Sequence, residues 1–175
     1  MSKITTSQTI GPFSHEAWQW AVDASLPDAV PAAGATVLVS GVIYDGDGAP
    51  VNDAQIEVWT PQGADAEPGR LIPGFRRAPS GEQGEFSMRV AAPAGGGEPL
   101  MYVTVFARGL VKHQFTAVFL EDDAALAQSA ILNQVPQARR ATLLARKMED
   151  GRGEPSYRWD IHLQGEQETV FFDYV

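Results

Sequence analysis

An alternation of apolar and polar residues near the C-terminus is the clearest structural pattern in the chain. Tyr, Trp, Ile and Leu occupy every second position from residue 157 to 163, and polar residues fill the positions between them. This two-residue period predicts a strand with one buried and one solvated face. Residues 165–168 predict a turn, and the more apolar run at residues 169–172 predicts a further strand that needs cover on both faces.

Shorter apolar stretches, separated by turns that contain Gly or Pro, predict the other strands. These stretches comprise residues 37–39, 42–44, 55–59, 85–90, 101–107 and 114–120. Ser40 and Gly41 predict a turn between the first two stretches. Residues 61–80 form the longest segment that we expect to be irregular, and long loops in compact domains often carry function or contact a partner.

Helical signal follows the last of these strands. Residues 122–130 and 137–143 are rich in Ala, Leu, Gln and Arg and predict two short helices, with Asp122 or Asp123 as a cap. A further short helix is expected within residues 15–24, which contain two tryptophans.

The strands dominate this pattern and predict an all-β fold, an antiparallel β-sandwich with a short helical excursion. Hydrophobic residues make up 44% of the chain, which is typical of a globular domain and too apolar for a disordered one. No repeat or composition break occurs, so we expect one domain over residues 1–175. The polar, turn-rich residues 1–13 predict an extended N-terminal arm that lies on another surface.

The net charge of the chain argues against some classes of binding partner. A formal net charge of −9 and a pI near 4.7 oppose binding to phosphate backbones and to anionic lipid. The absence of cysteine excludes disulfides and thiolate metal sites and is compatible with the cytosol. Neither a signal peptide nor an 18-residue apolar span is evident, so we expect a soluble cytoplasmic protein.

No local motif for catalysis or metal binding is present. His15, His113 and His162 are far apart and form none of the spacings that place two imidazoles on one face of an element. A nucleophile elbow, a Walker loop and a dinucleotide fingerprint are also lacking. We interpret the paired acids at residues 122–123 and at Glu166 and Glu168 as charges at a helix start and in a turn, with a general acid/base pair as the alternative.

Several segments nevertheless resemble one enzyme family. Residues 157–173 read Tyr-Arg-Trp-Asp-Ile-His-Leu-Gln-Gly-Glu-Gln-Glu-Thr-Val-Phe-Phe-Asp, and residues 7–13 read Ser-Gln-Thr-Ile-Gly-Pro-Phe. Phe-Ala-Arg-Gly at residues 106–109 and Arg-Arg-Ala-Thr-Leu-Leu-Ala-Arg at residues 139–146 add two more segments. All four resemble the α subunits of protocatechuate 3,4-dioxygenase, an intradiol ring-cleaving dioxygenase.

The resemblance implies a chain that does not itself bind iron. In this family the catalytic β subunit holds non-haem Fe(III) with two tyrosines and two histidines, and the histidine positions correspond to Leu100 and Tyr102. The tyrosine positions correspond to residues 92–95 and 60–66, which contain no tyrosine. Leu100 cannot bind iron and Tyr102 has no companion ligand, so we expect no metal ligand and no catalytic residue here, with Fe(III) bound by the partner β subunit.

The resemblance also implies substrate-binding residues. In the family the α arm forms part of the wall of the active-site pocket, which assigns Thr9, Gly11, Pro12 and Phe13 to that wall, with Arg108 nearby. An arginine suits the carboxylate of protocatechuate, and Gly-Pro lets the backbone approach a ligand in a fixed turn. As alternatives, Gly11 and Pro12 form an ordinary turn, and Arg108 pairs with an acidic side chain at the interface. Phe13 stands where the family has tyrosine, which removes a hydroxyl donor.

The resemblance implies that the chain functions as an α-type subunit of protocatechuate 3,4-dioxygenase. Its iron-bearing β partner would cleave protocatechuate with O2 to 3-carboxy-cis,cis-muconate. The two chains would form a pseudo-symmetric pair, repeated in a larger closed assembly, with Trp18, Trp20 and Phe75 as candidates for burial in interfaces.

Two other functions stay open at this point. The first is a stand-alone β-sandwich binding module that has lost the enzyme activity. The second is an independent iron enzyme, which would require the fold to gather scattered tyrosines and histidines, Tyr102, Tyr157 and Tyr174 among them.

Overall fold

The computed structural model of the chain describes residues 35–61, 67, 72–93, 95–149 and 153–173. The strands in these residues are β1 (Thr36–Tyr44), β2 (Gln55–Trp59), β3 (Phe75–Pro79), β4 (Glu85–Ala91), β5 (Met101–Phe106), β6 (Gln114–Leu120), β7 (Leu144–Met148), β8 (Ser156–Arg158) and β9 (Ile161–His162). Three short 3-10 helices are η1 (Leu126–Gln128), η2 (Leu132–Gln134) and η3 (Gln137–Leu143). Within the described residues, no helix has the length and apolar character to cross a membrane.

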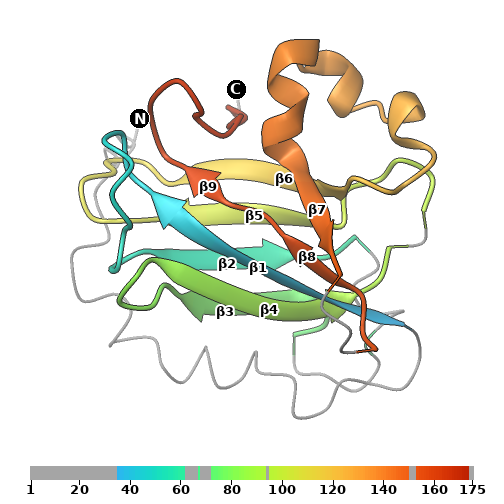
Figure 1. Cartoon of the computed structure of the whole chain (residues 1–175), viewed down its shortest axis with the longest axis horizontal. Helices are drawn as coiled ribbons and strands as arrows, with labels where there is room; N and C mark the ends of the chain where they lie inside the picture. Colours follow the sequence, from blue (N-terminus) through green and yellow to red (C-terminus); the bar gives the residue numbers. More distant parts are fainter. Residues whose placement is uncertain (1–34, 62–66, 68–71, 94, 150–152, 174–175) are drawn as a thin grey trace, which may run out of the picture.

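The strands form two layers with the core between them (Figure 1). One layer has the order β3-β2-β5-β6 and is antiparallel throughout. The order continues as β7-β8-β1-β4 in the other layer, with β9 also paired to β1. The β6–β7, β1–β8 and β1–β9 pairs are parallel, so the predicted sandwich is confirmed but is mixed rather than wholly antiparallel.

Residues from both layers fill the main core. Val39 and Ile43 of β1 face Ile56 and Val58 of β2 within one cluster, and all four are fully buried. β1 alternates between buried and half-buried positions along its whole length, as a two-residue period requires. Burying one such aliphatic side chain stabilises the fold by about 2 kcal/mol.

A second, smaller cluster lies on the opposite face of β6. Val118 belongs to the main core, whereas its neighbours Ala117 and Phe119 pack against Leu132 and Leu143 of the helical excursion. The predicted excursion is thus confirmed, but its helices are of the 3-10 type. η3 has the bounds expected over residues 137–143, whereas η1 is shorter than the helix expected over residues 122–130 and η2 was not expected. The helical excursion covers apolar side chains of β6 that would otherwise face solvent.

The burial of the side chains confirms the alternation that is predicted near the C-terminus. Tyr157, Trp159 and Ile161 are buried, and the polar residues between them are more exposed. The segment runs beside β1 but is divided into β8 and β9 at Asp160. There Asp160 Oδ1 accepts a hydrogen bond from the backbone N–H of Val42 at 2.8 Å, so a side chain takes the place of a backbone acceptor.

The turn expected at Ser40 and Gly41 is wrong, because β1 continues through both residues. Gly41 serves a packing need instead. A Cβ at this position would lie 1.8 Å from the carbonyl oxygen of Trp159 and 2.8 Å from the Phe86 ring. Glycine therefore allows the C-terminal segment to approach β1 closely.

Residues 169–172 form no strand, although the expected cover on both sides is present. Phe171 packs on the main core, whereas Val170 and Phe172 pack on the second cluster. The backbone N–H of Phe172 donates to Phe115 O at 2.7 Å, and Thr116 Oγ1 donates to Val170 O at 2.7 Å. Single hydrogen bonds to β6 thus hold the segment without a ladder.

The expectation of an irregular segment over residues 61–80 is also wrong in part, since β3 lies within it. Phe75 of β3 is buried against the ring of Trp59, 4.8 Å away, so it is not an exposed interface residue in this chain. Trp18 and Trp20, the expected helix at residues 15–24 and the arm at residues 1–13 lie outside the described residues.

Replacing Gly41 by alanine tests the close approach of Trp159. We expect Gly41→Ala to lower the free energy of unfolding by about 3 kcal/mol, because the added methyl group meets backbone that cannot give way. Ser40→Ala on the same strand is the control and should change it by less than about 0.5 kcal/mol. Urea denaturation followed by tryptophan fluorescence measures both. Equal stability of the two variants would contradict this account of the packing.

Candidate functional site

Of the five residues predicted to bind substrate, Arg108 lies within the described part of the chain. Arg108 lies in the turn that follows β5, directly before Gly109, whose φ of 89° favours glycine. Thr9, Gly11, Pro12 and Phe13 lie outside the described residues. Their assignment to a substrate pocket therefore stays a prediction.

Arg108 is held loosely by an acidic side chain of the same chain. Its Nε lies 3.0 Å from Asp53 Oδ2, yet that oxygen makes no hydrogen bond within the described structure. The Arg108 side chain is 69% exposed, whereas that of Asp53 is 11% exposed. The guanidinium of Arg108 is thus open to solvent, whereas the Asp53 carboxylate is buried. A ligand carboxylate can therefore reach Arg108 from the solvent side.

Asp53 was not identified from the sequence. It precedes β2 by two residues and is about fifty residues from Arg108, so only the β2–β5 pairing brings the two together. The acidic partner of Arg108 in the structure thus belongs to the same chain, whereas the alternative given for Arg108 places that partner at an interface.

The position that corresponds to the first missing histidine has become part of the core. Leu100 is fully buried in the main cluster, among side chains such as Val103. An apolar group at this depth offers no ligand atom, and a charged metal ion would be strongly disfavoured there.

Tyr102, the second of these positions, lies in an aromatic environment on the outer face of β5. Its ring stacks on Phe115 at 5.9 Å, and Phe172 follows at 6.4 Å from Phe115. These rings, with Val135 and Val170, line a largely apolar cavity of about 400 Å³. Burial, and to a lesser degree the charge of Glu98, raises the pKa of the Tyr102 hydroxyl. The neutral phenol is thereby favoured over the phenolate that a ferric ion requires.

No group of three or more His, Asp or Glu side chains in the described part of the chain could hold a metal ion. His113 packs against the ring of Phe106, and His162 stacks on Tyr44 at 4.9 Å. These residues come from different layers and do not converge on Tyr102. The residues that the structure describes do not fit a ferric site.

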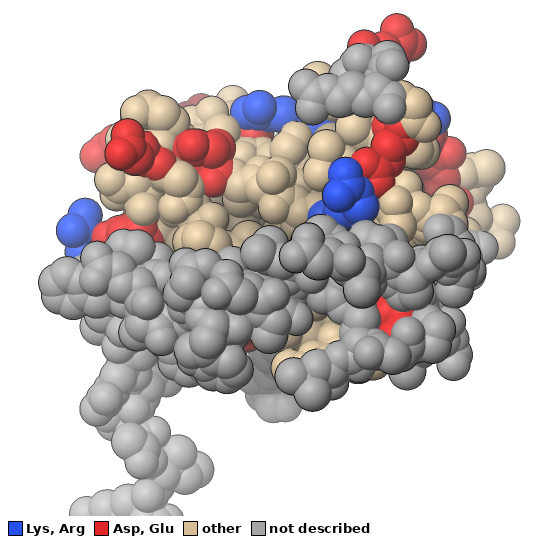
Figure 2. Space-filling model, turned by 90° about the horizontal axis from the view of Figure 1, so that it is seen from below, with Lys and Arg blue, Asp and Glu red and all other residues tan. Residues whose placement is uncertain are grey.

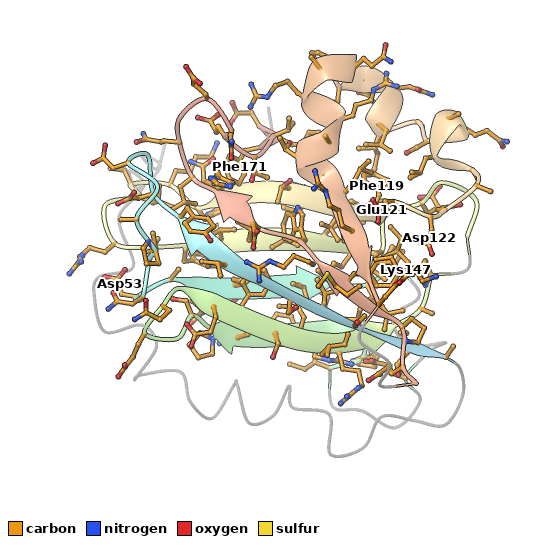
Figure 3. The ribbon with its side chains drawn as sticks, in the orientation of Figure 1. Asp53, Phe119, Glu121, Asp122, Lys147 and Phe171 are labelled. Atoms are coloured by element: carbon orange, nitrogen blue, oxygen red, sulfur yellow. The ribbon has the colours of Figure 1, made fainter. Side chains whose placement is uncertain are left out.

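Tyr157, which an independent iron enzyme would have to use, is engaged in a structural network. Its hydroxyl donates to Asp122 Oδ1 at 3.1 Å, and Lys147 Nζ donates to Asp122 Oδ2 at 2.7 Å. The hydrogen bond from Lys147 and that from Tyr157 lower the pKa of Asp122, whereas burial and the Asp122 hydrogen bond raise the pKa of Tyr157. Figure 3 shows Asp122 and Lys147 at the opposite end of the sandwich from Asp53.

The surface charge agrees with the acidic composition. On the face shown in Figure 2, the described part carries interspersed acidic and basic side chains and no continuous basic patch.

Comparison with known proteins identifies the family. The chain is 34% identical over 192 aligned residues to the protocatechuate 3,4-dioxygenase alpha chain of Burkholderia cepacia, with 98% of both chains covered. It belongs to the protocatechuate 3,4-dioxygenase α-chain family. The alpha chain of Pseudomonas putida is also 34% identical, over 97% of this chain and 96% of the relative. A scan against protein-family models found no match.

Solved structures agree on the fold. A dioxygenase domain from Streptomyces sp. SirexAA-E has a TM-score of 0.61 at 18% identity and covers 80% of this chain and 85% of its own. Catechol 1,2-dioxygenase from Acinetobacter sp. ADP1 has a TM-score of 0.60 at 17% identity, over 86% of this chain and 60% of its own. The chain is therefore an α-type subunit with an intradiol dioxygenase fold.

Replacing Tyr157 by phenylalanine tests whether this tyrosine is structural. We expect Tyr157→Phe to lower the free energy of unfolding by about 1 kcal/mol at pH 7, because the Asp122 carboxylate loses the hydrogen bond that the tyrosine hydroxyl donates. The pKa of Asp122 is lowered in the folded state, so its contribution is present above the ordinary value of 3.8 and is lost as the pH falls below it. The difference from the unmodified chain should therefore shrink toward about pH 3.

Tyr44→Phe is the matched control, because the Tyr44 hydroxyl has no hydrogen bond with the described residues. Urea denaturation at several pH values compares the two variants. An equal loss in both, or a loss that does not depend on pH, would contradict the role given to Tyr157.

Proposed function

We propose that this chain is the α-type subunit, without bound iron, of an enzyme that cleaves protocatechuate with O2 to 3-carboxy-cis,cis-muconate. The observation that carries the proposal is the full-length similarity to α chains together with core residues where an iron ligand would stand. The Fe(III) that activates the catechol ring is bound by the partner β subunit. This chain contributes to the shape and charge of the pocket and to the exclusion of water from it.

The proposed part of Arg108 is to bind the carboxylate of the substrate. Its exposure and its weak hold on Asp53 support this role, because the guanidinium is free to form a charge-assisted pair. Thr9, Gly11, Pro12 and Phe13 are proposed to line the same pocket from the N-terminal arm.

An exposed aromatic group supports a contact with a partner chain. Trp59 is 47% exposed and packs against the tilted ring of Phe75, and it pairs across the sheet with Tyr102. Ile72, also exposed, adds to the apolar surface near the end of β2. Large exposed apolar side chains are typical of surfaces that are buried in assemblies. We propose a hetero-oligomer of αβ units, located in the cytoplasm.

Production of this chain with and without an intradiol dioxygenase β chain tests the proposal. We expect the chain alone to be colourless and inactive, and the complex to be red-brown from Fe(III)–tyrosinate absorption and active on protocatechuate. Visible spectra, iron analysis and oxygen uptake measure these properties. Stoichiometric iron and ring cleavage by the chain alone would overturn the proposal, and a stable monomer that binds no β-type chain would favour the stand-alone binding module.

Replacing Arg108 tests the carboxylate contact. In the active complex, Arg108→Ala should raise the KM for protocatechuate about tenfold or more and leave the KM for catechol, which has no carboxylate, much less affected. Lys112→Ala, an exposed cation of the same β5–β6 connection, is the matched control and should affect neither substrate. Equal effects of Arg108→Ala on both substrates would remove the proposed role.

A further inference from the structure

We propose that a cavity beside η3, which Arg108 does not line, binds a small oxyanion through carboxylate or phosphate oxygens. The cavity has a volume of about 470 Å³ and lies between η3, β8 and the segment after β9. Its lining includes Arg139, Arg146, Arg158, Trp159 and Glu166. In Figure 1 the orange helical segment and the red C-terminal segment, which both contribute residues to this lining, rise on the same side of the sandwich. We call it the arginine cavity.

Arginine is concentrated here although the chain as a whole is strongly acidic, with a net charge of −9. Arg158 is neutralised by Asp160, because its Nη2 lies 2.8 Å from Oδ1 and its Nε donates to Oδ2 at 3.2 Å. Asp160 Oδ1 also accepts the Val42 N–H, so both oxygens of this carboxylate are already in use. Asp160 is therefore not free to neutralise the other two arginines.

Arg139 and Arg146 have no carboxylate partner among the described residues. The other acidic side chain in the lining is Glu166, which is exposed. One acid opposite two unpaired guanidinium groups leaves a local excess of positive charge. A bound anion would balance that charge, and the guanidinium group is the side chain best suited to carboxylate and phosphate.

Arg139 also provides a hydrogen-bond donor in need of an acceptor. Its Nη2 donates to Glu168 O at 2.6 Å, which fixes the direction of the side chain. Its Nε is buried and has no hydrogen-bond partner in the described structure. Buried polar groups without partners are rare, and each one calls for an ion, a water molecule or a ligand. An oxyanion satisfies this donor and the charge at the same time.

The rest of the lining favours a small and specific ligand. Trp159 is held in place by its own hydrogen bond, from Nε1 to Thr142 O at 2.9 Å. Thr142 Oγ1 donates to Arg139 O at 2.9 Å and accepts the Val170 N–H at 3.2 Å, so it connects η3, which carries Arg139, to the C-terminal segment. Cavities of this volume hold small molecules. The site is independent of the iron chemistry and of the proposed function.

Calorimetric titration of the full chain, in the complex in which it purifies, tests the inference. The probes are inorganic phosphate and succinate, each at constant ionic strength maintained with sodium chloride. We expect saturable binding of at least one probe. Arg139→Gln and Arg146→Gln should each weaken that binding about tenfold, since each removes one charge-assisted contact.

Lys112→Gln is the control, because it removes one positive charge at a distant turn, where Lys112 pairs with Asp173. Arg139→Lys, which keeps the charge, should weaken binding less than Arg139→Gln, and circular dichroism verifies that each variant is folded. Binding of phosphate alone, of succinate alone or of both supports the site and tells which source of oxyanion it accepts. Absence of saturable binding, or an equal loss in Lys112→Gln, would overturn the proposal.

Discussion

The approach of the Trp159 carbonyl to Gly41 is the contact on which the arrangement of this chain depends. β1 is the first strand of the described structure and β8 and β9 are the last, and they lie side by side because Gly41 has no side chain. The Trp159 N–H donates to Ser40 O at 2.8 Å, and its indole donates to Thr142 O at 2.9 Å. One residue thus connects β1 to the end of η3.

The contact between Trp159 and Gly41 affects the packing on both faces of the sandwich. Since η3 is held by Trp159, Leu143 can pack under Phe119 in the second cluster, and Arg139 can face β8 across the arginine cavity. Inside the sandwich, the Phe86 ring meets the Trp159 ring edge-on at 6.4 Å. The same contact therefore organises the main core, the cover over β6 and the cavity outside it.

The chain has an intradiol dioxygenase fold, and the two positions that the family resemblance aligns with iron-binding histidines hold residues that fit the apolar packing around them. Leu100 extends the apolar core, and Tyr102 rests against Phe115 in a cavity that favours its neutral form. Both changes remove groups whose burial without a metal ion would be costly. What the α-type chain retains at its surface is a lightly held arginine, Arg108, which suits a contribution to a pocket shared with a partner.

A buried ion pair fixes one part of the chain that the sequence pattern left undefined. Arg76 of β3 and Glu67 are both almost fully buried, and Arg76 Nη1 donates to Glu67 Oε2 at 3.0 Å. Glu67 Oε2 also accepts the Gly74 N–H at 2.7 Å, so the carboxylate ties the approach to β3 onto the strand itself. Such a pair offsets the cost of burying two charges only with several hydrogen bonds, which it has. No local pattern around residue 67 indicates it.

The sequence pattern alone determined the strands with strong periodicity and the family of the chain. It also determined which side chains at residues 157–163 face the core and which face solvent. All three properties depend on residues that are neighbours along the chain. Tertiary structure decided the rest. Gly41 looked like a turn residue, and Thr169 to Phe172 looked like a strand, because the carbonyl and the rings that they meet come from distant segments. The partners of Arg108 and Arg139 likewise arise from strand order, which brings together side chains that no spacing along the chain relates.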